Sequence, residues 1–286
     1  MDGRVAFEWA VSTLGCPEWD ADAVIDRLAG TGYGAIEWRG GDEGTVRTDW
    51  SSERRAALRR RTRDAGLRAI AVTAYPDLVA SDAVVRRASL DGIVAHAELA
   101  AALDAPWVRI FLGIADDEPP PAVVVGRAVD GIAAALDATA GMGVGLAIEP
   151  HDDLVRAGDV APVLARVPGA RVGVVWDIGN AWAVGETPDA GFAAYAGRIA
   201  WTQVKDGRGT GDDWRLCDLG DGEVPIGRAL ALLATGGGAH DPDGTRPVVS
   251  LEWERAWHPE LAPAEVAFPR ALDWLVRTAA RLPAGT

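Results

Sequence analysis

The chain alternates short, almost purely apolar runs with longer amphipathic or alanine-rich segments, and this alternation repeats eight times. Runs such as VGVVWD and GLAIE lack a polar residue at every second position, which is typical of parallel strands buried on both faces. They predict strands over 5–9, 33–39, 67–75, 106–112, 144–149, 172–177, 199–205 and 248–253. The intervening segments predict helices over 21–29, 51–65, 81–103, 122–140, 159–166, 188–195, 226–234 and 265–280.

Eight strand-then-helix units predict an α/β protein in which residues 1–286 form a single (β/α)₈ TIM-barrel domain. A doubly wound parallel sheet is the structural alternative. Such a sheet usually has about five to seven strands and a glycine-rich loop after the first of them. The segment VAFEWAVSTLG contains no GxGxxG pattern, so the barrel is the better prediction.

Composition and charge narrow the class of partner. The chain is 49% hydrophobic and carries 28 basic against 42 acidic residues, a formal charge of −14, which argues against a nucleic-acid partner. No apolar run approaches the roughly 18 residues of a membrane span, and the acidic start MDGRVAFEWAV does not resemble a signal peptide. Cys16 and Cys217 fit no CxxC pattern. We therefore expect a cytoplasmic protein with reduced thiols, no membrane partner and a small-molecule substrate; a homo-oligomer remains open.

Four polar residues mark a candidate metal site. In a TIM barrel the active site lies at the C-terminal ends of the strands. Glu149, Asp177, Gln203 and Glu252 end, or nearly end, the fifth to eighth apolar runs. Three carboxylates meeting an amide oxygen would repel one another without a cation, and an all-oxygen set suits one divalent ion, Mn²⁺ or Mg²⁺. The alternative is that these side chains cap strand ends or pair with nearby arginines.

Two further residues carry candidate catalytic chemistry. His151 lies two residues after Glu149, and an imidazole titrates near neutral pH, so it is the preferred acid–base group, with a solvated loop histidine as the alternative. Lys205 is the only lysine of the chain and faces the same way as Gln203, two residues before it. Its compact ammonium could stabilise an enolate oxygen or bind a substrate hydroxyl.

Other residues near strand ends are candidates for binding the substrate. Arginines there could clamp a carboxylate or a phosphate, or pair with a neighbouring acid. Aromatic side chains could pack against a sugar ring or belong to the core. The glycine-containing loop over 207–222 could cover the mouth of the barrel. The candidate substrate-binding residues are Arg39, Tyr75, Arg109, Asn180, Trp253 and His258.

The strand-end motifs STLGCPEWD, GYGAIEWRG, IEPHDD, WDIGNAW, QVKDG, LGDGEVPIG and SLEWERAWHPEL occur in this order along nearly the whole chain. Together they resemble the xylose-isomerase-like TIM-barrel superfamily, the sugar phosphate isomerase and epimerase family. The resemblance implies that the family's metal ligands Glu, Asp, His and Glu map onto Glu149, Asp177, Gln203 and Glu252. Two positions depart from the family pattern: Gln203 replaces the histidine of HxKD, and Asn180 replaces that of DxGH and cannot serve as a base.

The resemblance implies a metal-dependent isomerase or epimerase that acts on a sugar, a cyclic polyol or a related polyhydroxylated keto compound through an enediolate. Glu149, Glu252 or His151 would move the proton. If a neighbouring group leaves instead, the same intermediate gives a dehydratase or lyase, as in members acting on inosose, 3-dehydroshikimate or C-glycosides. A DNA-repair endonuclease would need more histidines and a basic groove, and an accessory barrel without activity would not need the four ligands.

Overall fold

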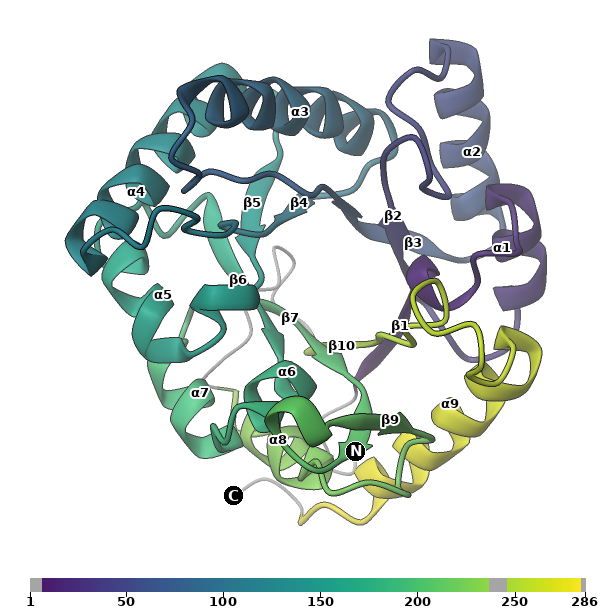
Figure 1. The fold of residues 1–286 in the computed structure, drawn as a ribbon. Helices are drawn as coiled ribbons and strands as arrows, with labels where there is room; N and C mark the ends of the chain where they lie inside the picture. Colours follow the sequence, from purple (N-terminus) through teal and green to yellow (C-terminus); the bar gives the residue numbers. More distant parts are fainter. Residues whose placement is uncertain (1–6, 237–245, 284–286) are drawn as a thin grey trace.

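The computed structural model describes residues 7–236 and 246–283, and it contains a closed barrel of eight parallel strands in the order β1-β10-β7-β6-β5-β4-β3-β2 (Figure 1). The predicted (β/α)₈ barrel is therefore confirmed. The barrel strands are β1 (Glu8–Ser12), β2 (Ala35–Arg39), β3 (Arg68–Thr73), β4 (Trp107–Ile110), β5 (Gly145–Ile148), β6 (Val172–Asp177), β7 (Ile199–Val204) and β10 (Val248–Leu251). A separate antiparallel pair consists of β8 (Asp206–Arg208) and β9 (Arg215–Cys217).

Helices form a ring around the barrel (Figure 1). Their ends follow local sequence signals: Asp20 and Ser51 each accept a hydrogen bond from a backbone N–H of the helix that they precede, and Gly30 takes a φ of 73° just after a helix. The helices are α1 (Ala21–Leu28), α2 (Ser52–Asp64), α3 (Ala83–Ala102), α4 (Pro121–Ala138), α5 (Ala157–Leu164), α6 (Ile178–Ala183), α7 (Pro188–Ala194), α8 (Ile226–Leu233) and α9 (Ala264–Ala280).

Three differences separate the structure from the elements predicted near the site and at the first strand. The first strand covers Glu8–Ser12, three residues later than predicted, and residues 5 and 6 lie outside the described part. The short helix α6 was not predicted; it begins directly after β6 because the Asp177 side chain accepts hydrogen bonds from the first backbone N–H groups of the turn. The β8–β9 hairpin, which begins at Asp206 and includes part of the loop over 207–222, was not predicted.

The inside of the barrel is filled mainly by alanine and two tryptophans, Trp107 and Trp201, in a cluster to which every barrel strand contributes. Gly145 makes room for the first of these indoles, because a Cβ at this position would lie 2.4 Å from Trp107 Cζ3. Close packing of large rings against small residues leaves the apolar layer solid. The buried polar side chains Glu37, Glu149, Asp177, Gln203 and Glu252 lie toward the C-terminal ends of the strands, whereas Glu8 and Arg68 pair at the opposite end.

Asp206, the first residue of β8, binds the segment that follows β9 close to the end of β7. Its side chain is 2% exposed, and its two carboxylate oxygens accept hydrogen bonds from four backbone N–H groups. The donors are Gly207, Gly220, Gly222 and Val224. Asp206 directly follows Lys205 in the chain, so the hairpin is fixed next to the candidate site.

His96 on α3 is a partly buried histidine away from the candidate site. Its Nδ1 lies 2.8 Å from the carbonyl oxygen of Gly92, its Nε2 has no hydrogen-bond partner, and a Cβ at Gly40 would lie 2.7 Å from its Cδ2. Burial lowers the pKa of His96. The unfolded chain therefore takes up a proton at a higher pH than the folded chain, and stability is lost as the pH falls.

We expect the wild-type protein to lose more unfolding free energy than His96→Phe when the pH is lowered from 7.5 to 5. Phenylalanine keeps a ring in the same space but does not titrate, so the difference between the two proteins isolates this histidine. The difference is at most about 1.4 kcal/mol per pH unit. Urea unfolding at both pH values measures it, and equal losses in the two proteins would contradict the assignment.

Among the described residues, no helix is long and apolar enough to cross a membrane. Cys16 is buried and Cys217 is partly buried, and both are free thiols, as expected from the sequence.

Candidate metal and catalytic site

The three predicted carboxylates meet at the C-terminal end of the barrel. Asp177 is the last residue of β6, whereas Glu149 and Glu252 directly follow β5 and β10. The backbone N–H groups of Glu149 and Glu252 donate to the carbonyl oxygens of Ile110 and Val204, which continues the strand pairing through both residues. Each of the three side chains offers an oxygen, and these oxygens all lie within 4.8 Å of one another. All three residues are at most 3% exposed.

Gln203 lies in the same cluster. It is in register with Asp177 on one neighbouring strand and with Ser250 on the other. Its Nε2 donates to Glu252 Oε1 at 3.1 Å and to Glu37 Oε1 at 2.9 Å. Its Oε1 is buried and has no hydrogen-bond donor. The amide thus has one acceptor oxygen free for a further partner.

Two buried cations face these acids. Arg109 Nε lies 3.2 Å from Glu149 Oε2, and Lys205 Nζ lies 2.7 Å from both Asp177 Oδ2 and Glu252 Oε2. Both cations are 2% exposed. With Glu37, the described residues of this buried layer include four carboxylates and two cations, which leaves an excess of two negative charges when all are ionised.

The pKa values of these groups are set first by burial and then by the neighbouring charges. Burial raises the pKa of Glu149 well above its usual range, although Arg109 opposes the shift, and burial raises the pKa of Asp177 to about 7 against the effect of Lys205. At Glu252 burial acts in the same direction, but Lys205 and Arg109 outweigh it and lower the pKa to about 2. Burial opposes the charge of Lys205, yet the surrounding carboxylates hold its pKa well above the usual value, so it is an ammonium.

The donor set fits a divalent cation. Gln203 Oε1 is buried and receives no hydrogen bond from the described residues, whereas Glu149 Oε2 and Asp177 Oδ2 face only the cations Arg109 and Lys205. The other oxygen of Asp177 is already used, because Oδ1 accepts from the backbone N–H groups of Gly179 and Asn180. A bound divalent ion would match the excess of two negative charges, and buried polar atoms of this kind normally have a partner.

Glu37 is a member of the cluster that the sequence analysis did not include among the site residues. It is fully buried, and its carboxylate accepts hydrogen bonds from Trp201 Nε1, Gln203 Nε2 and Ser250 Oγ at 3.3, 2.9 and 3.0 Å. Burial raises its pKa to about 7, while Arg109 opposes the shift. The signal in the sequence is a single acid inside an otherwise apolar strand, AIEW, and its structural role is to orient the amide of Gln203.

His151 belongs to an aromatic group on the β4 and β5 side of the site. Its ring stacks on Phe111 at 4.2 Å between centroids, and its Nδ1 lies 2.9 Å from Asp152 Oδ1. The guanidinium of Arg109 covers the rings of Phe111 and Tyr75 at 4.3 and 5.0 Å. Tyr75 is 45% exposed, so this group links the buried ion pair to solvent.

The remaining predicted side chains lie around this layer. Arg39 stacks on Trp257 at 4.6 Å, and its Nη1 donates to the carbonyl oxygen of Glu43. Asn180 lies in the first turn of α6, and its Nδ2 is buried without a partner. His258 lies 3.7 Å from Glu254, the third acid that contacts Lys205.

Trp253, a predicted substrate-binding residue, packs into the hydrophobic core. It is 3% exposed and belongs to the hydrophobic core, and its Nε1 donates to the carbonyl oxygen of Ala262 at 2.8 Å. A Cβ at Gly15 would lie 2.9 Å from Trp253 Cβ, which shows how closely the indole is packed. Residues alternate in direction along a strand, so Trp253 points outward where Glu252 points into the barrel. This packing favours a structural role for Trp253, the alternative that the sequence analysis left open for aromatic residues.

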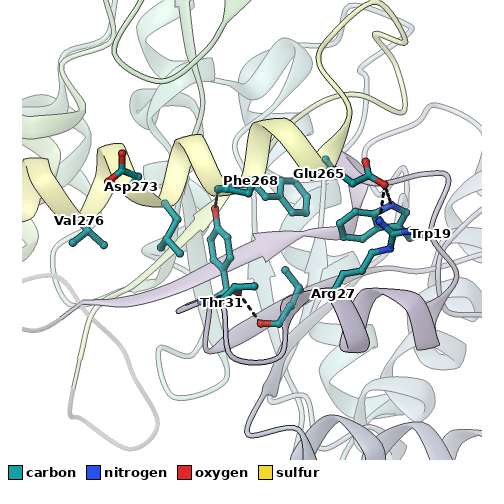
Figure 2. A pocket seen from close by; sticks show the side chains of 12 residues that line it. Trp19, Arg27, Thr31, Glu265, Phe268, Asp273 and Val276 are labelled. Atoms are coloured by element: carbon teal, nitrogen blue, oxygen red, sulfur yellow. Dashed lines mark hydrogen bonds and ion pairs between the residues drawn. The ribbon is translucent and has the colours of Figure 1, made fainter.

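A cavity of about 640 Å³ lies on the outer wall of the barrel, between α1 and α9. At one end Arg27 and Trp19 both contact the carboxylate of Glu265, with the Arg27–Glu265 distance at 2.7 Å (Figure 2). Its lining is largely apolar and includes Phe268 and Leu272. It shares no residue with the acidic cluster, so it is separate from the candidate site.

Comparison with known proteins agrees with the fold and the sequence motifs. Residues 25–278 match the profile of the family described as xylose isomerase-like TIM barrel. The IOLI protein, whose structure holds a zinc atom, is 18% identical, with 97% of this chain and 100% of that chain covered and a TM-score of 0.81. No curated protein sequence gives a significant match.

Two further solved structures represent different activities. D-psicose 3-epimerase from Clostridium cellulolyticum H10, described with D-tagatose, is 15% identical over 96% of this chain and 99% of that chain, with a TM-score of 0.71. The probable 3-DHS dehydratase AsbF from Bacillus anthracis is 15% identical over 94% of this chain and 99% of that chain, with a TM-score of 0.75. At these identities the likeness shows a common fold and does not choose between the activities.

Proposed function

The chain belongs to the xylose isomerase-like TIM-barrel family, and we propose that it is a divalent-metal-dependent isomerase or epimerase that acts on a sugar or a related polyhydroxylated keto compound. The observation that supports this proposal most is the cluster of Glu149, Asp177 and Glu252 at the C-terminal end of the barrel, with oxygens within 4.8 Å of one another. This end is where TIM barrels carry out their chemistry.

We propose that Glu149, Asp177, Glu252 and the free Oε1 of Gln203 hold the metal. Because all four donors are oxygen atoms, Mn²⁺ or Mg²⁺ is the expected ion. When bound, such an ion polarises a substrate carbonyl and stabilises the negative charge of an enediolate.

The residues around the cluster would position the substrate and move its proton. Tyr75 presents a half-exposed ring for packing against a sugar ring, and Arg39, Asn180 and His258 lie around the acidic layer. Lys205 supplies an ammonium for an enolate oxygen, and Arg109 keeps Glu149 paired. A carboxylate or His151 would remove the hydrogen on the carbon next to the carbonyl. Its return to the neighbouring carbon gives isomerisation, and return to the opposite face gives epimerisation.

The proposal is tested by a panel of ketoses and inososes in D₂O, with protein that has been stripped by a chelator and then reloaded with Mn²⁺ or Mg²⁺. We expect metal-dependent interconversion of at least one ketose, with deuterium at the reacting carbon provided that the base exchanges its proton with solvent. Metal retention without reaction of any ketose, but with water loss from an inosose, would replace this function by the second candidate.

That second candidate is a dehydratase or lyase, in which a neighbouring group leaves from the same enediolate. The observation that favours it is the amide of Gln203, which stands where the family usually has histidine. This position resembles that of some dehydratase members, which have glutamine there. The substrate panel therefore includes 3-dehydroshikimate and a 3-keto-glycoside, and the products distinguish the two reactions directly.

We expect His151→Ala to lower kcat by roughly 10²-fold or more while the metal content per chain stays at the wild-type value, because this is the usual cost of removing an acid–base group. His151 contacts Phe111 and Asp152 and none of the proposed ligands at the distances described. Steady-state kinetics and elemental analysis on the same sample measure both quantities. Turnover near the wild-type value would assign the base to Glu149 or Glu252 and favour an epimerase.

A further inference from the structure

Lys205 is the only lysine in the chain, and its ammonium contacts three carboxylates. Nζ lies 2.7 Å from Asp177 Oδ2, 2.7 Å from Glu252 Oε2 and 2.5 Å from Glu254 Oε1. The first two acids belong to the proposed metal site, whereas the third does not. The Glu254 side chain is 18% exposed and lies toward His258, at 3.7 Å, so it is the outermost of the three partners.

The oxygens that Lys205 contacts are those that a metal ion would need. Asp177 Oδ1 is bound by two backbone N–H groups, which leaves Oδ2 as its available oxygen, and Oδ2 is paired with Lys205. Glu252 Oε1 accepts from Gln203, which leaves Oε2, and Oε2 is also paired with Lys205. At both acids the remaining oxygen is therefore held by the same ammonium.

A divalent ion coordinated by Asp177 Oδ2 and Glu252 Oε2 would stand about 2.0–2.6 Å from each oxygen. An ammonium 2.7 Å from the same two atoms would then be forced close to the ion, and two cations at such a distance in a buried site repel strongly. Burial makes this repulsion larger than in water, because Lys205 is only 2% exposed.

We propose that Lys205 and the divalent ion compete for Asp177 and Glu252, and that metal binding moves Nζ off these two acids while it keeps Glu254. Glu254 is then a positioning residue, because it gives the displaced ammonium a carboxylate outside the metal site. This inference rests on the proposed metal site, but it concerns binding and not turnover. It also accounts for a lysine at this position, since a flexible four-carbon stem allows the movement that a planar arginine fork would hinder.

The single lysine allows a direct test. A chain labelled with ¹⁵N only in lysine gives one side-chain amine signal, that of Lys205, because no other lysine is present. We expect this signal to move to a new position when Mg²⁺ or Zn²⁺ is added to chelator-stripped wild-type protein. In Glu254→Gln the same addition should also broaden or weaken the signal, because the displaced ammonium has lost its carboxylate. Metal that binds without changing the signal would overturn the competition, while leaving the proposed function intact.

Calorimetric titration with Mn²⁺ provides an independent measurement. Lys205→Met should bind Mn²⁺ about tenfold more tightly or better, because the competing charge is gone. Glu254→Gln should weaken Mn²⁺ binding in the wild-type background. In the Lys205→Met background it should change the affinity by less than about threefold. This double-mutant cycle tests whether Glu254 acts through the lysine. Glu260→Gln, an exposed acid of the same segment, is the matched control.

Each outcome decides the proposal. Equal or weaker binding by Lys205→Met overturns the competition, and equal effects of Glu254→Gln in both backgrounds overturn its positioning role. If Lys205→Met folds only when Mn²⁺ is present, the ion has replaced the lysine charge, which supports the proposal. If it folds in neither condition, the lysine signal of the wild-type protein decides. If neither the wild-type protein nor a folded Lys205→Met binds any metal, the proposed function fails together with this inference.

Discussion

Replacing Glu252 by glutamine should abolish metal retention and lower turnover by roughly 10³-fold or more. Glu252 is one of the three clustered carboxylates, and it also accepts from Gln203 and pairs with Lys205. The amide removes a charge from the ligand set and gives Lys205 one carboxylate fewer. Loss of a metal that stabilises transition-state charge costs several kcal/mol, which corresponds to this reduction in rate. Elemental analysis after gel filtration and steady-state kinetics measure the two losses.

The matched control is Glu260→Gln, the same chemical change at a side chain that is 70% exposed and contacts only the ring of His258 in the described contacts. It should retain the wild-type metal content. Circular dichroism and the unfolding temperature separate loss of metal from loss of fold. A folded Glu252→Gln protein that keeps one metal per chain and turns over normally would place the metal, and the chemistry, somewhere else.

The barrel could be predicted from the sequence because its strands are buried on both faces, so each reads as an apolar run bounded by polar residues. The bounds of the first strand could not be predicted from hydropathy. The strand begins at the polar residue Glu8, which is paired with Arg68, 60 residues away. The helix α6 was missed for another reason. It is six residues long and follows β6 without a break, which is too short for a helical period to show.

The core of the candidate site was also accessible from the sequence. Glu149, Asp177, Gln203 and Glu252 were found because the fold places strand ends together, and the structure brings the four side chains into one buried cluster. What could not be found is the pairing across the barrel. The role of Glu37 depends on Gln203 and Ser250, which are 166 and 213 residues away, and no local pattern specifies such contacts.

Glu254 and Trp253 show that the direction of a side chain could not be predicted from the sequence. Both follow Glu252 at the end of one apolar run, and the sequence analysis expected substrate contact from the tryptophan. The alternation of side chains along a strand sends Trp253 into the core and returns Glu254 toward Lys205. A shift of one residue in the register would exchange these roles, so the direction of each side chain is known only once the strand is placed.

Asp206→Asn is expected to give the largest loss of stability outside the proposed ligands, about 3 kcal/mol or more of unfolding free energy. Asp206 is 2% exposed, and its carboxylate accepts hydrogen bonds from four backbone N–H groups at 2.8–3.1 Å. Asparagine replaces one acceptor oxygen by an amino group, which then faces backbone donors, and each buried donor without a partner costs about 1–3 kcal/mol. Gly222 packs tightly against this carboxylate, because a Cβ there would lie 2.0 Å from Asp206 Oδ1.

Urea unfolding measures this loss. Asp212→Asn is the matched control, because it makes the same change at an exposed position of the same hairpin. Its unfolding free energy should stay within about 0.5 kcal/mol of the wild-type value. Hydrogen exchange adds a local reading. If Asp206 anchors the hairpin to the end of β7, the amides of Gly220, Gly222 and Val224 should exchange faster in Asp206→Asn than in the wild-type protein, while those of α3 are unchanged. Unchanged protection at these amides, together with wild-type stability, would show that the hairpin is held by its other contacts, such as the ion pair of Asp218 with Arg270.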